Sequence, residues 1–295
     1  MYNKIGYIEY NSNENESYIH NIINKIFNKI NICEIEKDKI KILINKRKIS
    51  DKLLLKMVQL IKVNEINKLV ISNEIDINKK SLTDNKIELL NGKKLMKNML
   101  MSILSIIYEY NNIDMRSSEV YIAIKDDKEL KIISELASNF RCINIVTDRI
   151  RKLNRLESKF DKNDQIIYSI SSNRNKSLKR AKIIINFDYN SDFFEEFCIN
   201  RSAIIINLSD SKIKMKTSFQ GVVIENIDVN FENYNNTKFD KNILYESYIY
   251  NLNYEELQCK LIEDKCQIKG FLGANGKINK YELKAIALDK NVKKD

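Results

Sequence analysis

The chain has 295 residues, of which 43% are hydrophobic and 9% aromatic, a share large enough to build a hydrophobic core. This composition excludes a wholly disordered protein, and the sequence lacks the run of about 18 apolar residues that a membrane-spanning helix requires. The N-terminal residues also lack the basic start and apolar block of a secretory signal. We therefore expect a cytoplasmic protein without membrane association.

Residues needed for several common catalytic mechanisms are scarce. The sequence has one histidine, His20, which lies among apolar residues at helical spacing, and it has no tryptophan. A Ser-His-Asp or Cys-His mechanism would have to use that histidine, so nucleophilic hydrolysis is disfavoured. The five cysteines are widely spaced, and no two of them form a Cys-x-x-Cys pair. We therefore expect no bound metal and a reducing compartment.

The positive charge of the chain is concentrated in one segment. Lysine and arginine number 50 against 40 acidic residues, a formal net charge of +10 at pH 7. Between Arg141 and Lys182 there are 12 basic and 4 acidic residues, an excess of 8. Such a cluster indicates a partner that carries phosphate, although a solvated helix face without any ligand explains it equally well.

The first 115 residues alternate predicted helices and strands. Their apolar positions recur at helical spacing in some stretches and alternate or run together in others. The predicted elements are a helix at about 17–30, a strand at Lys39–Ile44, a helix starting near Ser50, a strand at Lys68–Ser72 and a long buried helix at Lys93–Tyr110. We expect residues 1–115 to form a small α/β unit.

From residue 119 short runs of Ile and Val alternate with amphipathic helices. The predicted strands are Val120–Ile124, Cys142–Val146, Gln165–Ile170, Lys182–Phe187 and Ala203–Asn207. The predicted helices are Lys128–Phe140, Arg149–Phe160, Lys176–Ala181 and Ser191–Cys198. Continuous apolar strands are buried on both faces, and strand–helix alternation makes them parallel. Residues 116–231 are therefore predicted to form a doubly wound, mainly parallel sheet.

Beyond Ile224 the pattern loosens. Residues 232–242 are polar and predict a linker, and residues 245–262 carry apolar positions at helical spacing. A glycine-containing segment, GFLGANGK, precedes a last predicted helix at about 279–288. We expect residues 232–295 to form a linker and a helical C-terminal extension.

The order of elements from 119 to 227 resembles the Rossmann-like domain of NAD(P)-binding proteins of the shikimate-dehydrogenase and glutamyl-tRNA-reductase type. The likeness is carried by VYIAIK and its following helix, by INIVTDR at 143–149, by SLKRAKIIINFD at 177–188 and by AIIINLSD at 203–210. The resemblance implies an α/β Rossmann-like fold, a dinucleotide cofactor and an arginine, here Arg149, near the adenosine ribose phosphate. It identifies no catalytic residue in this chain.

The turn after the first strand of this domain departs from the family pattern. The dinucleotide fingerprint needs glycines there, so that backbone amides can approach the pyrophosphate at the helix N-terminus. Here the turn reads Lys125-Asp126-Asp127-Lys128-Glu129 without glycine. The two aspartates would cap the helix and repel a pyrophosphate. We therefore expect no cofactor, with NADP as the alternative.

Candidate ligand-binding residues follow from the position of the predicted strand ends, because ligands of open α/β sheets bind beyond the carboxyl ends of the strands. Arginine and lysine suit a phosphate group there, and a threonine hydroxyl can add a hydrogen bond. The candidates are Thr147, Arg149 and Arg151 after the second strand, Arg174 and Lys176 after the third, and Asp188 after the fourth.

Three functions stay open at this point. The first is a degenerate Rossmann-like protein that is non-catalytic or binds a phosphate-bearing small ligand. The second is an NAD(P)-dependent oxidoreductase with an atypical phosphate loop, using Asp188, Tyr189 or a lysine as acid or base. The third is a nucleic-acid-binding protein that uses the basic 141–182 face, where only Phe160 and Tyr168 offer aromatic rings for stacking.

Overall fold

The computed structural model of the chain describes residues 3–10, 30–36, 38–162, 166–231 and 238–284. The chain forms two compact units. Unit 1 comprises Met1–Gly92 and Phe231–Lys265, and unit 2 comprises Lys93–Asn230 and Cys266–Asp295. Each unit is thus assembled from two separate stretches of the chain.

This division groups the expected segments 1–115, 116–231 and 232–295 differently, because residues 93–115 fall in unit 2 and residues 232–265 fall in unit 1. Helix α5 (Leu100–Tyr110) belongs to unit 2, where the ring of Tyr108 packs edge-on against Phe140 with 5.5 Å between the ring centroids. Helix α9 (Lys241–Ile249) belongs to unit 1, where Leu244 packs in the same apolar cluster as Ile5. Apolar contacts between segments distant in the sequence set both boundaries.

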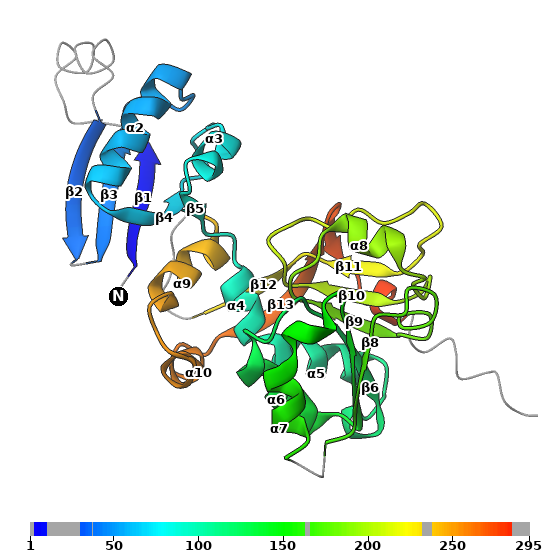
Figure 1. Cartoon of the computed structure of the whole chain (residues 1–295). Helices are drawn as coiled ribbons and strands as arrows, with labels where there is room; N and C mark the ends of the chain where they lie inside the picture. The colour runs from blue at the N-terminus through cyan, green and yellow to red at the C-terminus, as the bar shows by residue number, and fades with distance from the viewer. Residues whose placement is uncertain (1–2, 11–29, 37, 163–165, 232–237, 285–295) are drawn as a thin grey trace, which may run out of the picture. The chain divides into compact units, whose positions relative to one another are not determined.

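Unit 1 is built on a five-stranded sheet in the order β2-β3-β1-β4-β5 (Figure 1). Every neighbouring pair is parallel except β2 and β3, which are antiparallel. The strands are β1 (Lys4–Tyr10), β2 (Ile30–Glu36), β3 (Lys39–Ile44), β4 (Ile66–Ile71) and β5 (Glu88–Leu89). The helices of this unit are α2 (Asp51–Val63), α3 (Lys79–Asp84), α9 and α10 (Tyr254–Glu263).

The predictions for unit 1 are confirmed for β3, β4 and α2, but the central strand β1 was not predicted. Its sequence interrupts the apolar pattern with Gly6, where a Cβ would lie 2.7 Å from the end of the Leu69 side chain. Ser50 is the residue before α2 in extended conformation, yet its side chain makes no capping hydrogen bond. A helix was expected at about 17–30. Residues 17–29 of that range, with His20, lie outside the described residues, and Ile30 is the first residue of β2.

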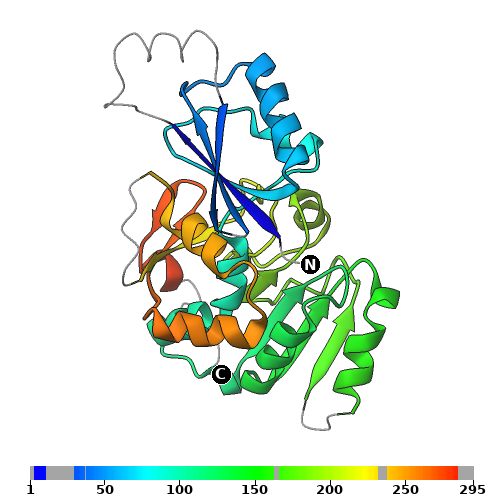
Figure 2. The same ribbon diagram turned by 90° about the vertical axis from the view of Figure 1, so that its left-hand side faces the viewer.

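Unit 2 contains a six-stranded sheet in which all neighbouring strands are parallel. The strands are β6 (Glu119–Ala123), β7 (Cys142–Val146), β8 (Tyr168–Ser171), β9 (Ile183–Asn186), β10 (Ile204–Asn207) and β11 (Val222–Ile224). Their spatial order is β11-β10-β9-β6-β7-β8, so the first strand lies between the second and the fourth (Figures 1 and 2). This is the doubly wound order of Rossmann-like sheets, and it confirms the predicted fold class.

The strands of this sheet are buried as their composition predicts. All four residues of β9 and all four of β10 are buried, which is the expected pattern for strands covered on both faces. The remaining regular elements of unit 2 are the helices α4 (Lys93–Asn98), α5, α6 (Leu130–Asn139), α7 (Asn154–Phe160) and α8 (Ser191–Glu196), with the antiparallel strands β12 (Asn226–Asn230), β13 (Gln267–Gly273) and β14 (Gly276–Ile278).

Three predicted helices have different boundaries in the structure. The helix predicted at Arg149–Phe160 is a 3₁₀ turn, η2 (Ile150–Lys152), followed by α7. The helix predicted at Lys176–Ala181 is a series of turns, because the side-chain oxygen of Asn173 accepts the backbone N–H groups of Asn175 and Lys176. The long helix at Lys93–Tyr110 is divided at Met99 into α4 and α5.

The expected C-terminal extension contains the helices α9 and α10, and it continues as the antiparallel hairpin β13–β14. Gly276 begins β14 with a positive φ of 114°, a conformation that favours glycine at the hairpin turn. The last predicted helix is described only to residue 284, where residues 282–284 form a short 3₁₀ turn. Among the described residues, no helix is long and apolar enough to span a bilayer.

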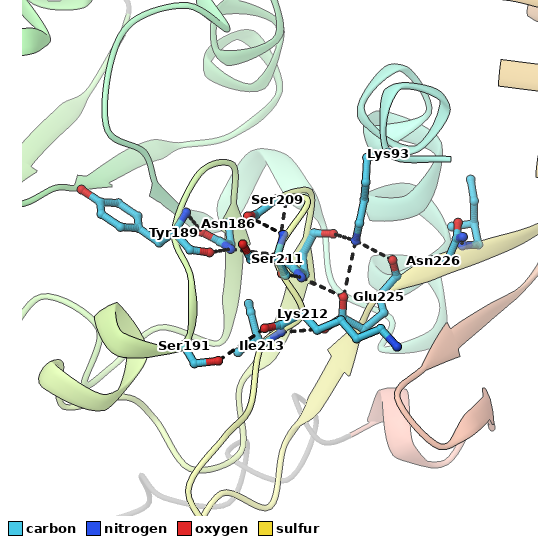
Figure 3. Close-up of polar contacts among 12 residues, drawn as sticks. Lys93, Asn186, Tyr189, Ser191, Ser209, Ser211, Lys212, Ile213, Glu225 and Asn226 are labelled. Atoms are coloured by element: carbon cyan, nitrogen blue, oxygen red, sulfur yellow. Dashed lines mark hydrogen bonds and ion pairs between the residues drawn. The ribbon is translucent and has the colours of Figure 1, made fainter. Parts of the chain in front are cut away.

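A buried polar network links the carboxyl ends of β9, β10 and β11 (Figure 3). The Asn186 amide donates to the Asn207 side-chain oxygen at 2.8 Å, and the Asn207 amide donates to Glu225 Oε2 at 2.7 Å. Lys93 Nζ, at the first residue of α4, donates to the carbonyl oxygens of Asn207 and Glu225, each at 2.6 Å. Burial lowers the pKa of the Lys93 ammonium group. Asn207 and Glu225 accept the hydrogen bonds of this group.

We predict that Lys93→Met destabilises the protein by about 3–5 kcal/mol, because it leaves the Glu225 carboxylate buried without its cation. Combining Lys93→Met with Glu225→Gln removes that charge, so the double variant should lose less than the sum of the two single variants. Urea unfolding of the four proteins measures the coupling. Additive losses, or a loss below about 1 kcal/mol for Lys93→Met, would contradict a structural role for the pair.

Candidate functional site

The strand order of unit 2 creates one topological switch point. The chain runs from β6 to β7 and β8 on one side of the sheet, and to β9, β10 and β11 on the other. In doubly wound sheets ligands bind outside the carboxyl ends of the strands at this position. We use the name switch point for the residues that follow β6 and β9, namely Ile124–Asp127 and Phe187–Tyr189.

The two aspartates in the turn after β6 form ion pairs with side chains of the same unit. Asp126 accepts the backbone N–H of Lys128 at 3.1 Å, and its carboxylate lies 2.9 Å from Lys128 Nζ. Asp127 is 8% exposed and receives two hydrogen bonds from the Arg155 guanidinium, from Nε at 2.8 Å and from Nη2 at 2.5 Å. These hydrogen bonds hold the pKa of Asp127 below its usual range. The N-terminal end of α6 therefore follows two ionised carboxylates rather than a glycine turn.

The side chain of Tyr189 occupies the centre of the switch point. Its hydroxyl lies 3.3 Å from the Ile124 carbonyl oxygen after β6 and 3.2 Å from the Thr147 hydroxyl after β7. It accepts the backbone N–H of Asp148 at 2.9 Å and donates to the Asp148 carboxylate. Burial, followed by the bond to Asp148, raises the pKa of Tyr189, so its hydroxyl keeps its proton. The side chain of Tyr189, in the loop after β9, thus extends across the end of β6 to the end of β7.

Asp188 has a structural contact at the same place. Its carboxylate accepts the backbone N–H of Lys125 at 3.2 Å, which joins the loops after β6 and β9. Burial raises the pKa of this carboxyl group, because the charged form loses solvation. Asp188 therefore helps to close the switch point, and it does not belong to the basic pocket described next.

A basic pocket lies at the carboxyl ends of β7 and β8. It has a volume of about 380 Å³ and is lined by Asp148, Arg149, Ile150, Arg151, Lys152 and Ser172. The turn η2 presents three cations along four consecutive residues, because the Lys152 N–H bonds to the Arg149 carbonyl at 2.9 Å. Asp148 lies 3.7 Å from Arg149 Nε, and both side chains are about half exposed.

The predicted site residues are partly brought together. Arg149 and Arg151 both line the basic pocket. Thr147 is fully buried and shapes the pocket from behind, since its hydroxyl accepts the Arg149 N–H at 3.0 Å. Arg174 and Lys176 do not line it: the Arg174 guanidinium lies 3.0 Å from the Glu196 carboxylate, and Lys176 is exposed in the loop after β8.

Sequence reasoning missed four lining residues of the basic pocket, namely Asp148, Ile150, Lys152 and Ser172. Ser172 follows β8, whose end lies at Ser171 rather than at the predicted Ile170. Lys152 was predicted only as part of the helix Arg149–Phe160. Among the described residues, no group of three or more His, Cys, Asp or Glu side chains is placed to hold a metal ion.

No protein-family model matches the chain, and no curated protein matches its sequence. Among solved structures, it is similar to phosphoglycerate oxidoreductase from Vibrio cholerae at 9% identity and a TM-score of 0.36, over 89% of this chain and 99% of that one. It is also similar to L-tryptophan dehydrogenase from Nostoc punctiforme, at 9% identity and a TM-score of 0.33. That match covers 72% of this chain and 65% of the dehydrogenase, just under two thirds of its length. A third similar structure is the dipicolinate synthase A chain from Bacillus subtilis, at 11% identity and a TM-score of 0.31. That match covers 69% of this chain and 79% of the synthase chain.

Similarity at this level does not define the activity of the chain, and TM-scores this low do not by themselves define its fold. The fold follows from the order and direction of the six strands of unit 2. The predicted resemblance is thus confirmed for a Rossmann-like α/β sheet, whereas membership in the shikimate-dehydrogenase or glutamyl-tRNA-reductase type is not shown. Unit 2 is a Rossmann-like domain with a basic pocket next to a switch point filled by its own side chains.

Proposed function

We propose that the protein is a non-catalytic Rossmann-like protein that binds a phosphate-bearing small molecule in the basic pocket. One observation carries this proposal: Arg149, Arg151 and Lys152 line one pocket of about 380 Å³ at the carboxyl ends of two parallel strands. A pocket of that size falls in the range of small-molecule sites. Ser172 also lines the pocket and adds a neutral hydroxyl group that can form hydrogen bonds.

The charges of the basic pocket favour a phosphate group. Three cations face one carboxylate, Asp148, whose charge already interacts with the Tyr189 hydroxyl and with Arg149. The pocket thus keeps a net positive charge, and arginine presents paired N–H donors that match two phosphate oxygens. A phosphate monoester, with close to two negative charges at neutral pH, fits this arrangement better than a singly charged carboxylate.

The lining residues do not form a recognisable catalytic set. They supply three cations, one carboxylate, one hydroxyl and one apolar side chain, and neither histidine nor cysteine is among them. The neighbouring Tyr189 hydroxyl is buried and engaged with Asp148, which leaves it unsuited to exchange protons with a ligand. For this reason the proposal assigns binding without catalysis.

We predict that Arg149→Ala and Arg151→Ala each weaken binding of inorganic pyrophosphate about tenfold or more, because each removes charge-assisted hydrogen bonds worth about 1.5–3 kcal/mol. Lys159→Ala and Lys162→Ala remove the same charge from outside the pocket and should leave the dissociation constant within about twofold. Isothermal calorimetry at fixed ionic strength compares all four variants with the unmodified protein.

Two results would argue against the basic pocket. Equal, modest weakening by all four substitutions, with tighter binding of oligonucleotides and a steep salt dependence, would favour the nucleic-acid alternative. Unchanged pyrophosphate binding in Arg149→Ala and Arg151→Ala would remove the pocket from consideration. Arg174→Ala is a further control, because its guanidinium pairs with Glu196.

An NADP-dependent oxidoreductase is the second candidate, and one observation favours it. Arg149 lies directly beyond β7, the second strand of a sheet in Rossmann-like order, where the family resemblance places an arginine near the ribose phosphate. Asp126 and Asp127 oppose this candidate, because they place two carboxylates where the pyrophosphate would approach α6.

We predict that the unmodified protein gives no binding isotherm with micromolar NADP. If it does bind NADP, the double substitution Asp126→Gly, Asp127→Gly should leave that binding intact or improve it. The change removes two negative charges and releases the Arg155 guanidinium from its pairing with Asp127. Calorimetry measures binding, and thermal unfolding verifies that the variant is folded. A micromolar isotherm with the unmodified protein would favour the oxidoreductase over the main proposal.

A further inference from the structure

We infer that Tyr189 determines ligand specificity: its ring takes the place of a ligand ring at the switch point and restricts the protein to compact phosphate-bearing molecules held in the basic pocket. This inference rests on the proposed function. It adds a residue that does not line the pocket, and it names the class of ligand that the protein excludes, namely phosphates linked to a planar ring system.

The first support is the position of the Tyr189 ring. The side chain is only 2% exposed although it lies where an open sheet normally receives its ligand. Its ring stacks on Phe193 of α8, with centroids 3.7 Å apart and planes 18° apart. Lys125 Nζ lies 5.0 Å from the centre of the same ring. A protein ring thus has the stacking and cationic contacts that a bound aromatic ring would otherwise make.

The second support is the hydrogen bonding of the Tyr189 hydroxyl. It meets groups that follow β6 and β7, namely the Ile124 carbonyl, the Thr147 hydroxyl and the backbone and carboxylate of Asp148. Asp148 also lines the basic pocket. The Tyr189 side chain therefore lies between the switch point and Asp148, a lining residue of the basic pocket. A ligand whose phosphate is held by Arg149 cannot extend a ring in that direction while Tyr189 stays in place.

The backbone of Tyr189 is fixed as firmly as its side chain. The Tyr189 N–H donates to the Asn186 side-chain oxygen at 3.0 Å, and its carbonyl accepts the Asn186 amide at 2.8 Å. Asn186 is fully buried and belongs to the network that includes Asn207 and Lys93. Displacement of the ring would break the hydrogen bonds of Tyr189 to Asn186 and Asp148. We therefore expect the ring to stay in place when a ligand binds.

The test compares Tyr189→Ala, which removes the ring, with Tyr189→Phe, which keeps the ring and removes the hydroxyl. The matched control is Tyr245→Ala in unit 1, because Tyr245 is also fully buried, stacks on Phe231 and donates to the Asp264 carboxylate at 2.8 Å. Each protein is titrated by calorimetry with inorganic pyrophosphate and with NADP. Thermal unfolding of Tyr189→Ala with and without p-cresol shows whether a ring-sized cavity has formed in a folded protein.

We expect Tyr189→Ala to bind NADP at least about tenfold tighter than the unmodified protein does, because the ring of the ligand can replace the ring that was removed. Tyr189→Phe and Tyr245→Ala should show no such gain. Pyrophosphate binding should change by less than about threefold in Tyr245→Ala, and it should weaken by the same factor in Tyr189→Ala and Tyr189→Phe, because both lose the hydroxyl that holds the Asp148 carboxylate. p-Cresol should raise the Tm of Tyr189→Ala and leave the Tm of the unmodified protein unchanged.

The inference is overturned if Tyr189→Ala is folded, gains stability from p-cresol and still binds NADP no better than the unmodified protein. An equal gain in Tyr189→Phe would also overturn it, because the ring would then not be the barrier. Failure of the proposed function looks different, since pyrophosphate would then bind none of the proteins. The p-cresol measurement reports on the cavity in either case.

Discussion

The hydroxyl group of Tyr189 connects the ends of three neighbouring strands. The residue follows β9, and its side chain reaches the Ile124 carbonyl after β6 and both Thr147 and Asp148 after β7. Its backbone is held by Asn186, which continues through Asn207 to the Lys93–Glu225 pair. Hydrogen bonds therefore connect the residues at the carboxyl ends of β6, β7, β9, β10 and β11. The same contacts that order the loops also fill the place where the fold would receive a ligand.

Charge distribution moves the candidate site away from that place. Asp126 and Asp127 make the approach to α6 negative, and Arg155 neutralises Asp127 rather than a bound phosphate. Positive charge collects instead at η2, one strand away, where Arg149, Arg151 and Lys152 line one pocket. Under the proposed function, the Rossmann-like sheet keeps its architecture while ligand binding lies at the edge next to β8 instead of at the switch point, because fold and site are set by different residues.

Much of the sheet of unit 2 was predictable, because uninterrupted runs such as Ile183–Ile185 and Ile204–Ile206 suit strands buried on both faces. The central strand of unit 1 was not, since Gly6 interrupts its apolar pattern. The boundaries of the units also depend on distant contacts. Arg149 was predictable from its place at a strand end, whereas the pairing of Arg174 with Glu196 depends on how α8 packs.

We propose that phosphate binds at η2 and not at the N-terminal end of α6. The most direct measurement is a titration of the ¹⁵N-labelled protein with pyrophosphate, followed by backbone amide chemical shifts in NMR spectra. We expect the largest, saturable shifts at Arg149–Lys152 and Ser172, with small shifts at Lys128–Leu130. Saturable shifts concentrated at Lys128–Leu130, with Arg149–Lys152 unaffected, would contradict this proposal.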